Sequence, residues 1–178
     1  DLKNKLIGIY GIEDDNELIR TKIKEIIGEL EDSKKNLYTD NCILNSVLNI
    51  KYSAAQVADI KIESNIFVPK YMNIDYGDMG VLFGNLLDNA IEANQGVDRK
   101  KRWINVSVKY EEHILIINIK NSKIRGSRRK KKGYLNHGIG LNSVKQIVEK
   151  FNGIVEVQDF GEMYEVSAIL YGICDDKD

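Results

Sequence analysis

Apolar residues recur at intervals of three and four along several stretches of the chain, and this period is typical of amphipathic helices. Residues 2–12 and 17–30 show it on either side of the polar, turn-prone residues 13–16, which predicts a helical hairpin. Further helices are predicted over residues 42–58, 75–94 and 140–152. Alone, the N-terminal hairpin cannot cover its own apolar stripe, so it must pack on the main domain or on a second copy of itself.

Alternation of apolar and polar residues predicts strands over residues 60–68, 103–108, 113–119, 153–157 and 164–170. The first of these has an irregularity at Ser64 and Asn65, and short turns rather than helices separate the later ones. Such connections favour an antiparallel or mixed sheet with the helices on one face. We therefore predict an α+β two-layer sandwich over residues 37–178, preceded by the helical hairpin over residues 1–36.

Composition narrows the class of protein. The chain has 178 residues, 43% of them hydrophobic, which suffices for a full core, and its net charge of −1 argues against a surface built to coat nucleic acid or anionic lipid. Cys42 and Cys174 lie far apart, which favours free thiols in a reducing compartment. No apolar run approaches the ~18 residues that cross a bilayer. A chain that starts on Asp is typical of an excised fragment, from which upstream membrane segments could have been removed.

Candidate chemistry begins with Asn85 and Asn89, which are four residues apart and so project from one helical face. An amide oxygen is a neutral, hard ligand for Mg²⁺, which takes further oxygens from water and substrate phosphates. Alternatively, the two amides form hydrogen bonds with the unpaired backbone groups of a buried helix end. On this motif alone, both interpretations stay open.

A second candidate is His137-Gly138-Ile139-Gly140-Leu141, which opens a predicted helix. Glycines at a helix N-terminus allow an anion to approach the unpaired N–H groups. A lone Gly-x-Gly is often only a turn, and no Gly-Lys-Ser/Thr follows that would make a Walker loop.

The segment before this motif is strongly basic, with eight Lys or Arg and no acidic residue among the 13 residues from Lys120 to Lys132. It is either a solvated loop, a lid attracted to a polyphosphate, or a patch for nucleic acid. Aromatic residues are absent until Tyr134, which argues against a stacking platform for single strands.

Together, an Asn-x-x-x-Asn-Ala helix, a hairpin ending at Asn121, a loop, and Gly-x-Gly-Leu opening a helix resemble the GHKL ATPase superfamily, whose fold is the Bergerat fold. That superfamily comprises gyrase-type, chaperone, histidine-kinase and mismatch-repair ATPases. The match runs from about residue 41 to residue 170. Within residues 45–51, 84–93 and 137–141 it is similar to sensor kinases of the quorum-sensing and citrate-sensing type.

The resemblance implies ATP and Mg²⁺ as cofactors and assigns a role to each matching residue. Asn89 would be the Mg²⁺ ligand, and Asn85 its neighbour facing the phosphates. The remaining cofactor-binding positions would be Gly138, Gly140 and Leu141 at the helix start, Asn121 at the adenine amino group, Lys132 at the terminal phosphate and His137. For His137, a place beside the phosphate or lid and a simple turn position are equally plausible.

The N-terminus matches the kinases more narrowly. They carry a His-Asp-x-x-Asn motif, and this chain begins Asp1-Leu2-Lys3-Asn4, so the phosphate-accepting histidine would immediately precede Asp1. Asp1 would assist proton removal, and Asn4 would orient water for dephosphorylating the partner. The alternative is coincidence, since helices readily start with Asp. His113 does not suit the acceptor role.

Departures from the family pattern bear on the chemistry. Most members use Asp-x-Gly-x-Gly, whereas this chain has Asn121-Ser122-Lys123-Ile124-Arg125, and a threonine often found near the last strands is replaced by Glu162 or Met163. The carboxylate that activates water in hydrolysing members falls at Asn85. An amide cannot act as that base, which favours phosphoryl transfer to a protein side chain over hydrolysis.

The leading hypothesis is the cytoplasmic catalytic part of a sensor histidine kinase that binds Mg·ATP and transfers its γ-phosphate to a histidine. The expected partners are a second copy, bound through the hairpin, and a response regulator; no nucleic acid is expected, and a membrane only through upstream segments. One alternative is an inactive nucleotide-sensing GHKL module, motivated by the departures at Asn121. A more distant alternative is a nucleic-acid binder that uses the basic loop.

Overall fold

The computed structural model describes residues 36–126 and 138–174. The chain divides into two units, Asp1–Leu37 and Tyr38–Asp178, and the fold below is that of the second. The helical hairpin predicted for residues 1–36 lies outside the described residues apart from residue 36, so it stays a prediction.

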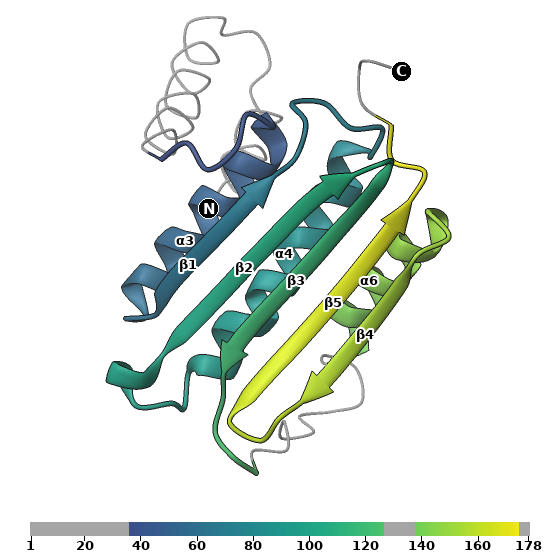
Figure 1. The fold of residues 1–178 in the computed structure, drawn as a ribbon. Coiled ribbons are helices and arrows are strands. Elements are labelled where there is room, and N and C mark those ends of the chain that lie inside the picture. Colours follow the sequence, from purple (N-terminus) through teal and green to yellow (C-terminus); the bar gives the residue numbers. More distant parts are fainter. Residues whose placement is uncertain (1–35, 127–137, 175–178) are drawn as a thin grey trace, which may run out of the picture. The chain divides into compact units, whose positions relative to one another are not determined.

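Within the described residues, three α-helices cover one face of a five-stranded sheet (Figure 1). In chain order, the elements are α3 (Cys42–Val57), β1 (Lys61–Phe67), α4 (Tyr76–Asn94), the 3-10 helix η2 (Arg99–Lys101), β2 (Trp103–Glu111), β3 (Ile114–Ser122), α6 (Gly138–Lys150), β4 (Ile154–Asp159) and β5 (Met163–Tyr171). The strand order is β1-β2-β3-β5-β4. Strand β1 runs parallel to β2 and all other pairs are antiparallel, which confirms the predicted α+β sandwich with a mixed sheet.

Helix α4 lies between α3 and α6 and forms the middle of the helical layer (Figure 1). Its N-cap, Asp75, accepts hydrogen bonds from the backbone N–H groups of Gly77 and Asp78, which satisfies donors that the first helical turn leaves unpaired. Its apolar stripe is almost completely buried: Met79, Leu82, Phe83, Leu86, Leu87 and Ala90. Helix α4 is therefore held in place by packing on both sides and against the sheet beneath it.

Two local expectations were wrong. Strand β1 pairs with β2 without interruption from Lys61 to Phe67, so the break in apolar alternation at Ser64 is not a bulge. His113 does not begin a strand; Glu112 and His113 form the β2–β3 turn, and both have positive φ, 46° and 64°. The two thiols, Cys42 and Cys174, are free, as predicted, and both are exposed.

Gly153 joins α6 to β4 at a point where no side chain fits. A Cβ built there would collide with the carbonyl oxygen of Ile169 on β5 and lie 2.6 Å from Cγ1 of Val148 on α6. Backbone oxygens cannot be moved aside without shifting β5. The absence of a Cβ at this position therefore sets how closely α6 approaches the sheet.

We predict that Gly153→Ala destabilises the domain by about 1–3 kcal/mol, because the added methyl overfills a packed junction. Gly80→Ala is the matched control. Gly80 lies inside α4 with no atom within 4 Å of an added Cβ, so the helix propensity of alanine should raise stability by about 0.5–1 kcal/mol. Urea unfolding of both variants measures the difference. Equal stabilities would contradict the proposed close approach at Gly153.

Candidate functional site

The first turn of α6 packs directly against the asparagine helix α4. A Cβ built on Gly140 would lie 3.4 Å from Oδ1 of Asn85 and 3.6 Å from its Cγ. These are van der Waals distances, so the Gly140 backbone and the Asn85 side chain are immediate neighbours. Asn89 follows one turn later on α4 and is also partly buried. The structure thus brings Asn85 and the start of α6 together, although Asn85 and Gly140 are 55 positions apart in the sequence.

The start of α6 has the properties of an anion site. The helix begins at Gly138, and Gly140 and Leu141 complete its first turn. The first backbone N–H groups of a helix have no partner within it, and they carry the positive end of the helix dipole. Val144, Ile147 and Val148 are buried and fix α6 on the core, so its first turn is held beside Asn85.

Asp88 lies next to Asn89 in the sequence but is directed to a different neighbour. Its two carboxylate oxygens accept hydrogen bonds from Nζ of Lys51 on α3, at 2.7 and 2.6 Å. The side chain of Asp88 is 49% exposed, so this pair contributes less than about 1 kcal/mol to stability. The ion pair links α3 to α4, and Asn89 is the next residue along α4. The pair was not anticipated, because 37 residues separate its members.

Asn121 lies at the end of β3 on the side that faces the helices, with 2% of its surface exposed. Its Nδ2 donates to the carbonyl oxygen of Ser122 at 2.9 Å. This bond fixes the orientation of the amide, because only the nitrogen end can donate to a carbonyl. The amide oxygen of Asn121 keeps its acceptor capacity, because this bond uses only the nitrogen end.

A buried polar network positions this strand end. Oγ of Ser122 donates to Oδ1 of Asn94, the last residue of α4, and accepts from the backbone N–H of Trp103 at 3.1 Å. Asn94 is fully buried, and its Nδ2 donates to the carbonyl oxygens of Ala90 and Trp103. The network locks the end of α4 to the first residue of β2 and the last residue of β3. Sequence reasoning missed it, because 28 residues separate Asn94 from Ser122.

The segment that leaves β3 is also anchored. The backbone N–H of Lys123 donates to the carbonyl oxygen of Glu162, and its Nζ contacts Oδ2 of Asp159 at 2.5 Å. Both partners belong to the β4–β5 hairpin. The bond from Lys123, with a second from the backbone N–H of Gly161, lowers the pKa of Asp159 below its ordinary value.

Four of the predicted site residues, Asp1, Asn4, Lys132 and His137, lie outside the described residues. Gly138 is described only as the first residue of α6. Among residues 36–126 and 138–174, no group of three or more His, Cys, Asp and Glu side chains could hold a metal ion. In the same ranges, no helix has the length and apolarity that crossing a membrane requires.

Sequence comparison assigns this α+β sandwich, in which an asparagine-bearing helix packs against a glycine-containing helix start, to a family. A family model described as a GHKL domain matches residues 74–170, more than half of the chain. The chain therefore belongs to the GHKL domain family. The matched range includes Asn85, Asn89, Asn121 and Gly140.

One curated relative is a probable C4-dicarboxylate sensor kinase of Bacillus subtilis (strain 168). It is 32% identical over an alignment of 95 positions, which covers 48% of this chain and 18% of that protein. The chain thus spans less than a fifth of the length of this relative.

Similar solved structures are histidine kinases. The catalytic domain of histidine kinase ThkA superimposes with a TM-score of 0.58 at 14% identity, covering 73% of this chain and 90% of that one. Full-length ShkA in complex with AMPPNP gives a TM-score of 0.55 at 14% identity, covering 74% of this chain and 30% of that one. At these identities the likeness concerns the fold.

We predict that Asn94→Ala destabilises the domain by about 1–3 kcal/mol, because it leaves buried polar groups of Ser122 and the backbone without their partner. Asn65→Ala, a matched amide deletion at an exposed position of β1, should change stability by less than about 0.5 kcal/mol. Denaturant unfolding gives both values. A loss at Asn94 no larger than that at Asn65 would show that the network does not hold the strand end.

Proposed function

We propose that this chain is the ATP-binding catalytic part of a sensor histidine kinase, of the quorum-sensing and citrate-sensing type, that transfers the γ-phosphate of ATP to a histidine. The observation that carries the proposal is the contact between Gly140 and Asn85. It brings a helix N-terminus, suited to phosphate, beside Asn85, and Asn89, one turn along α4, would supply an amide oxygen to a hydrated divalent cation. Membership of the GHKL family and a relative named as a sensor kinase support the same function.

The described residues suit a magnesium–nucleotide complex. Gly140 has no Cβ, so a phosphate group can approach the α6 backbone next to Asn85. Asn89 would supply an amide oxygen to Mg²⁺, whose other ligands would be water and phosphate oxygens. The amide oxygen of Asn121, at the end of β3 on the face that carries the helices, would accept from the amino group of adenine. When bound, Mg²⁺ neutralises phosphate charge, and the protein's own task is to position the nucleotide.

Phosphoryl transfer is favoured over hydrolysis for a reason of chemistry. Asn85 occupies the position where hydrolysing relatives have a carboxylate base, and its amide cannot accept a proton from water. In this proposal the acceptor histidine immediately precedes Asp1, which assists proton removal, and Asn4 orients water for dephosphorylation. Lys132 and His137 lie near the terminal phosphate. Residues 1–36 form the hairpin through which two copies associate.

This activity would belong to a two-component pathway. The phosphohistidine would pass its phosphate to an aspartate of a response regulator, and the catalytic part would lie on the cytoplasmic side of a membrane-bound sensor. The alternative is a GHKL module that senses nucleotide without transferring phosphate. It is motivated by Asn121, where most of the family has a charged carboxylate.

The direct test of the nucleotide site is calorimetric titration of the full chain with Mg·ATP. We expect Asn89→Ala to weaken binding roughly 100-fold, equivalent to about 2.7 kcal/mol, because a metal ligand is lost. With EDTA in place of Mg²⁺, the variant and the parent should bind ATP equally weakly. Asn65→Ala, an exposed amide deletion on β1, is the control and should bind as the parent does. Unchanged Mg·ATP affinity in Asn89→Ala would remove the metal assignment.

A separate experiment tests phosphoryl transfer. The chain as it stands should not autophosphorylate, whereas a variant carrying one added histidine before Asp1 should gain acid-labile, alkali-stable phosphate from labelled ATP. The same extension with glutamine is the control. Binding of Mg·ATP without phosphate on the added histidine would favour the nucleotide-sensing alternative. Labelled phosphohistidine on the unextended chain would contradict the assigned acceptor position.

A further inference from the structure

Lys51 is the only charged residue of α3, and it lies against the helix that carries the candidate site. Its Nζ donates to both carboxylate oxygens of Asp88, at 2.7 and 2.6 Å. Its stem crosses α4 one turn earlier, where Cε of Lys51 lies 3.9 Å from a Cβ built on Gly84. Lys51 therefore contacts the two residues of α4 that directly precede Asn85 and Asn89.

Stability does not account for the placement of Lys51. Its side chain is only 23% exposed, and ordering a long, charged side chain in a partly buried position costs free energy. The ion pair that it forms returns little, because the side chain of Asp88 is half exposed. A residue that departs from the local pattern without a gain in stability is expected at a functional site. The placement of Lys51 therefore points to a role in what Asp88 does beside Asn85 and Asn89.

Helical geometry places Asp88 at the edge of the two asparagines. An α-helix turns by about 100° per residue, so Asn85, Asp88 and Asn89 all project within about 100° of one another. Lys51 approaches Asp88 from α3, whereas Gly140 adjoins Asn85 from α6. Each oxygen of Asp88 keeps a lone pair after the bond from Lys51, and the carboxylate is half exposed. Asp88 can therefore also accept hydrogen bonds from water next to Asn89.

A carboxylate at this position has two opposite effects on a nucleotide site. Mg²⁺ keeps several of its waters when it binds to protein and phosphate oxygens, and a neighbouring carboxylate can hold such a water in place. The same negative charge repels a triphosphate. Lys51 favours the first effect over the second, because it fixes both oxygens of Asp88 and offsets the charge. The pair is thus suited to a hydrated cation that carries phosphate.

We propose that Asp88 holds a water of the magnesium ion bound at Asn89, and that Lys51 is a positioning residue that orients Asp88 and offsets its charge toward the triphosphate. The inference rests on the proposed nucleotide site and extends it by two residues to which the sequence motifs gave no role. Lys51 also keeps the ion from bonding to Asp88 directly, since its ammonium group already bonds both oxygens and repels a cation.

A direct bond from Lys51 to a phosphate group is the competing arrangement. It would require the ammonium group to leave both oxygens of Asp88. The two arrangements give opposite predictions for the loss of the Asp88 charge. A lysine that contacts phosphate would be released by that change and would bind ATP more tightly, whereas a carboxylate that holds a metal-bound water would be missed only when Mg²⁺ is present.

The first test is calorimetric titration of the full chain with ATP over a series of Mg²⁺ concentrations and in EDTA. We expect Asp88→Asn to raise the Mg²⁺ concentration for half-maximal enhancement of binding about tenfold, as the loss of an outer partner of a metal ion does. ATP binding in EDTA should not weaken, because a negative charge has been removed. Asp78→Asn is the matched control: Asp78 pairs with Lys150 at 3.0 and 2.8 Å and links α4 to α6, so its loss should change neither value.

Three outcomes for Asp88→Asn would contradict the proposal. Tighter Mg·ATP binding would show that the released Lys51 contacts phosphate, and equal weakening with and without Mg²⁺ would show that the pair is only a structural link. Unchanged binding at every Mg²⁺ concentration would overturn this inference alone. A parent chain that binds no Mg·ATP would instead overturn the proposed function, and this inference with it.

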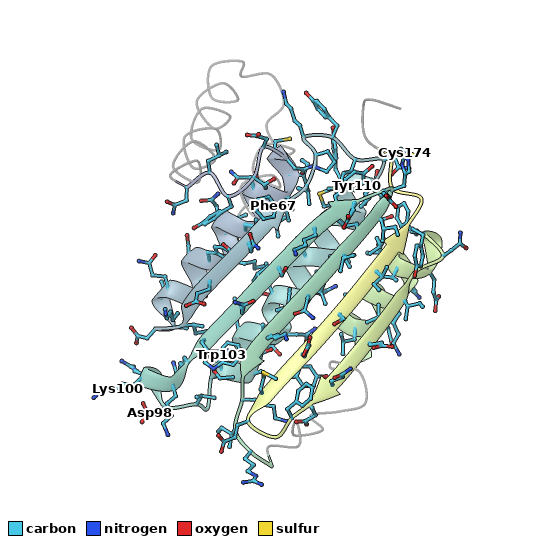
Figure 2. All side chains as sticks on the ribbon, viewed as in Figure 1. Phe67, Asp98, Lys100, Trp103, Tyr110 and Cys174 are labelled. Atoms are coloured by element: carbon cyan, nitrogen blue, oxygen red, sulfur yellow. The ribbon has the colours of Figure 1, made fainter. Side chains whose placement is uncertain are left out.

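The second test asks whether Lys51 acts through Asp88. Lys51→Met should raise the half-maximal Mg²⁺ concentration several-fold in the parent background and should have no such effect in the Asp88→Asn background, because no carboxylate then remains to be oriented. Lys51→Arg, which keeps a bidentate bond to a carboxylate, should behave as the parent does. Lys100→Met is the control for the lost charge, since Lys100 projects from η2 at one corner of the sheet (Figure 2). An equal shift by Lys51→Met in both backgrounds would overturn the positioning role.

Discussion

Helix α4 has to pack against the sheet and against α6 at the same time, and the rest of the domain depends on this requirement. Its apolar stripe is buried against the sheet, and its asparagine side must lie close to the first turn of α6. Gly140 is the residue of α6 that adjoins Asn85, and Gly153, where no Cβ fits, permits α6 to lie close to β5. A methyl group at Gly153 would separate α6 from β5 and displace the helix whose first turn adjoins Asn85, so the candidate site is a consequence of backbone packing.

The sheet contributes by bringing strand ends to the same place. Ser122 ends β3 directly after Asn121, Trp103 begins β2, and Ser122 and Trp103 both bond to Asn94 at the end of α4. Because the register is continuous along β2 and β3, the position of Asn121 follows from the pairing of the whole hairpin. Two constraints that are far apart in sequence, the α4–α6 contact and the β2–β3 register, therefore fix the amides of Asn85 and Asn121 independently of each other.

Sequence reasoning predicted the elements whose signals are periodic. The spacing of apolar residues predicted helices α4 and α6. The alternation of apolar and polar residues, with turn residues between the runs, predicted the β2–β3 and β4–β5 hairpins. It failed where a single residue departs from its pattern for a tertiary reason. Ser64 interrupts an alternating run without interrupting β1, because β2 supplies all the hydrogen bonds that keep the strand regular. His113 adjoins the alternating residues of β3 and was therefore assigned to the strand. The tight β2–β3 turn instead requires a positive φ at this residue.

The candidate site was predicted less completely than the fold. Short sequence motifs predicted three site residues, Asn85, Asn89 and Gly140. That they lie close together in the folded protein was a hypothesis that the sequence alone could not test. Lys51 and Asn94 could not be found, since each acts through a partner 28 or more residues away and neither pairing leaves a periodic signal. Long-range polar contacts of this kind depend on the assembled fold, which a single sequence does not encode in any local pattern.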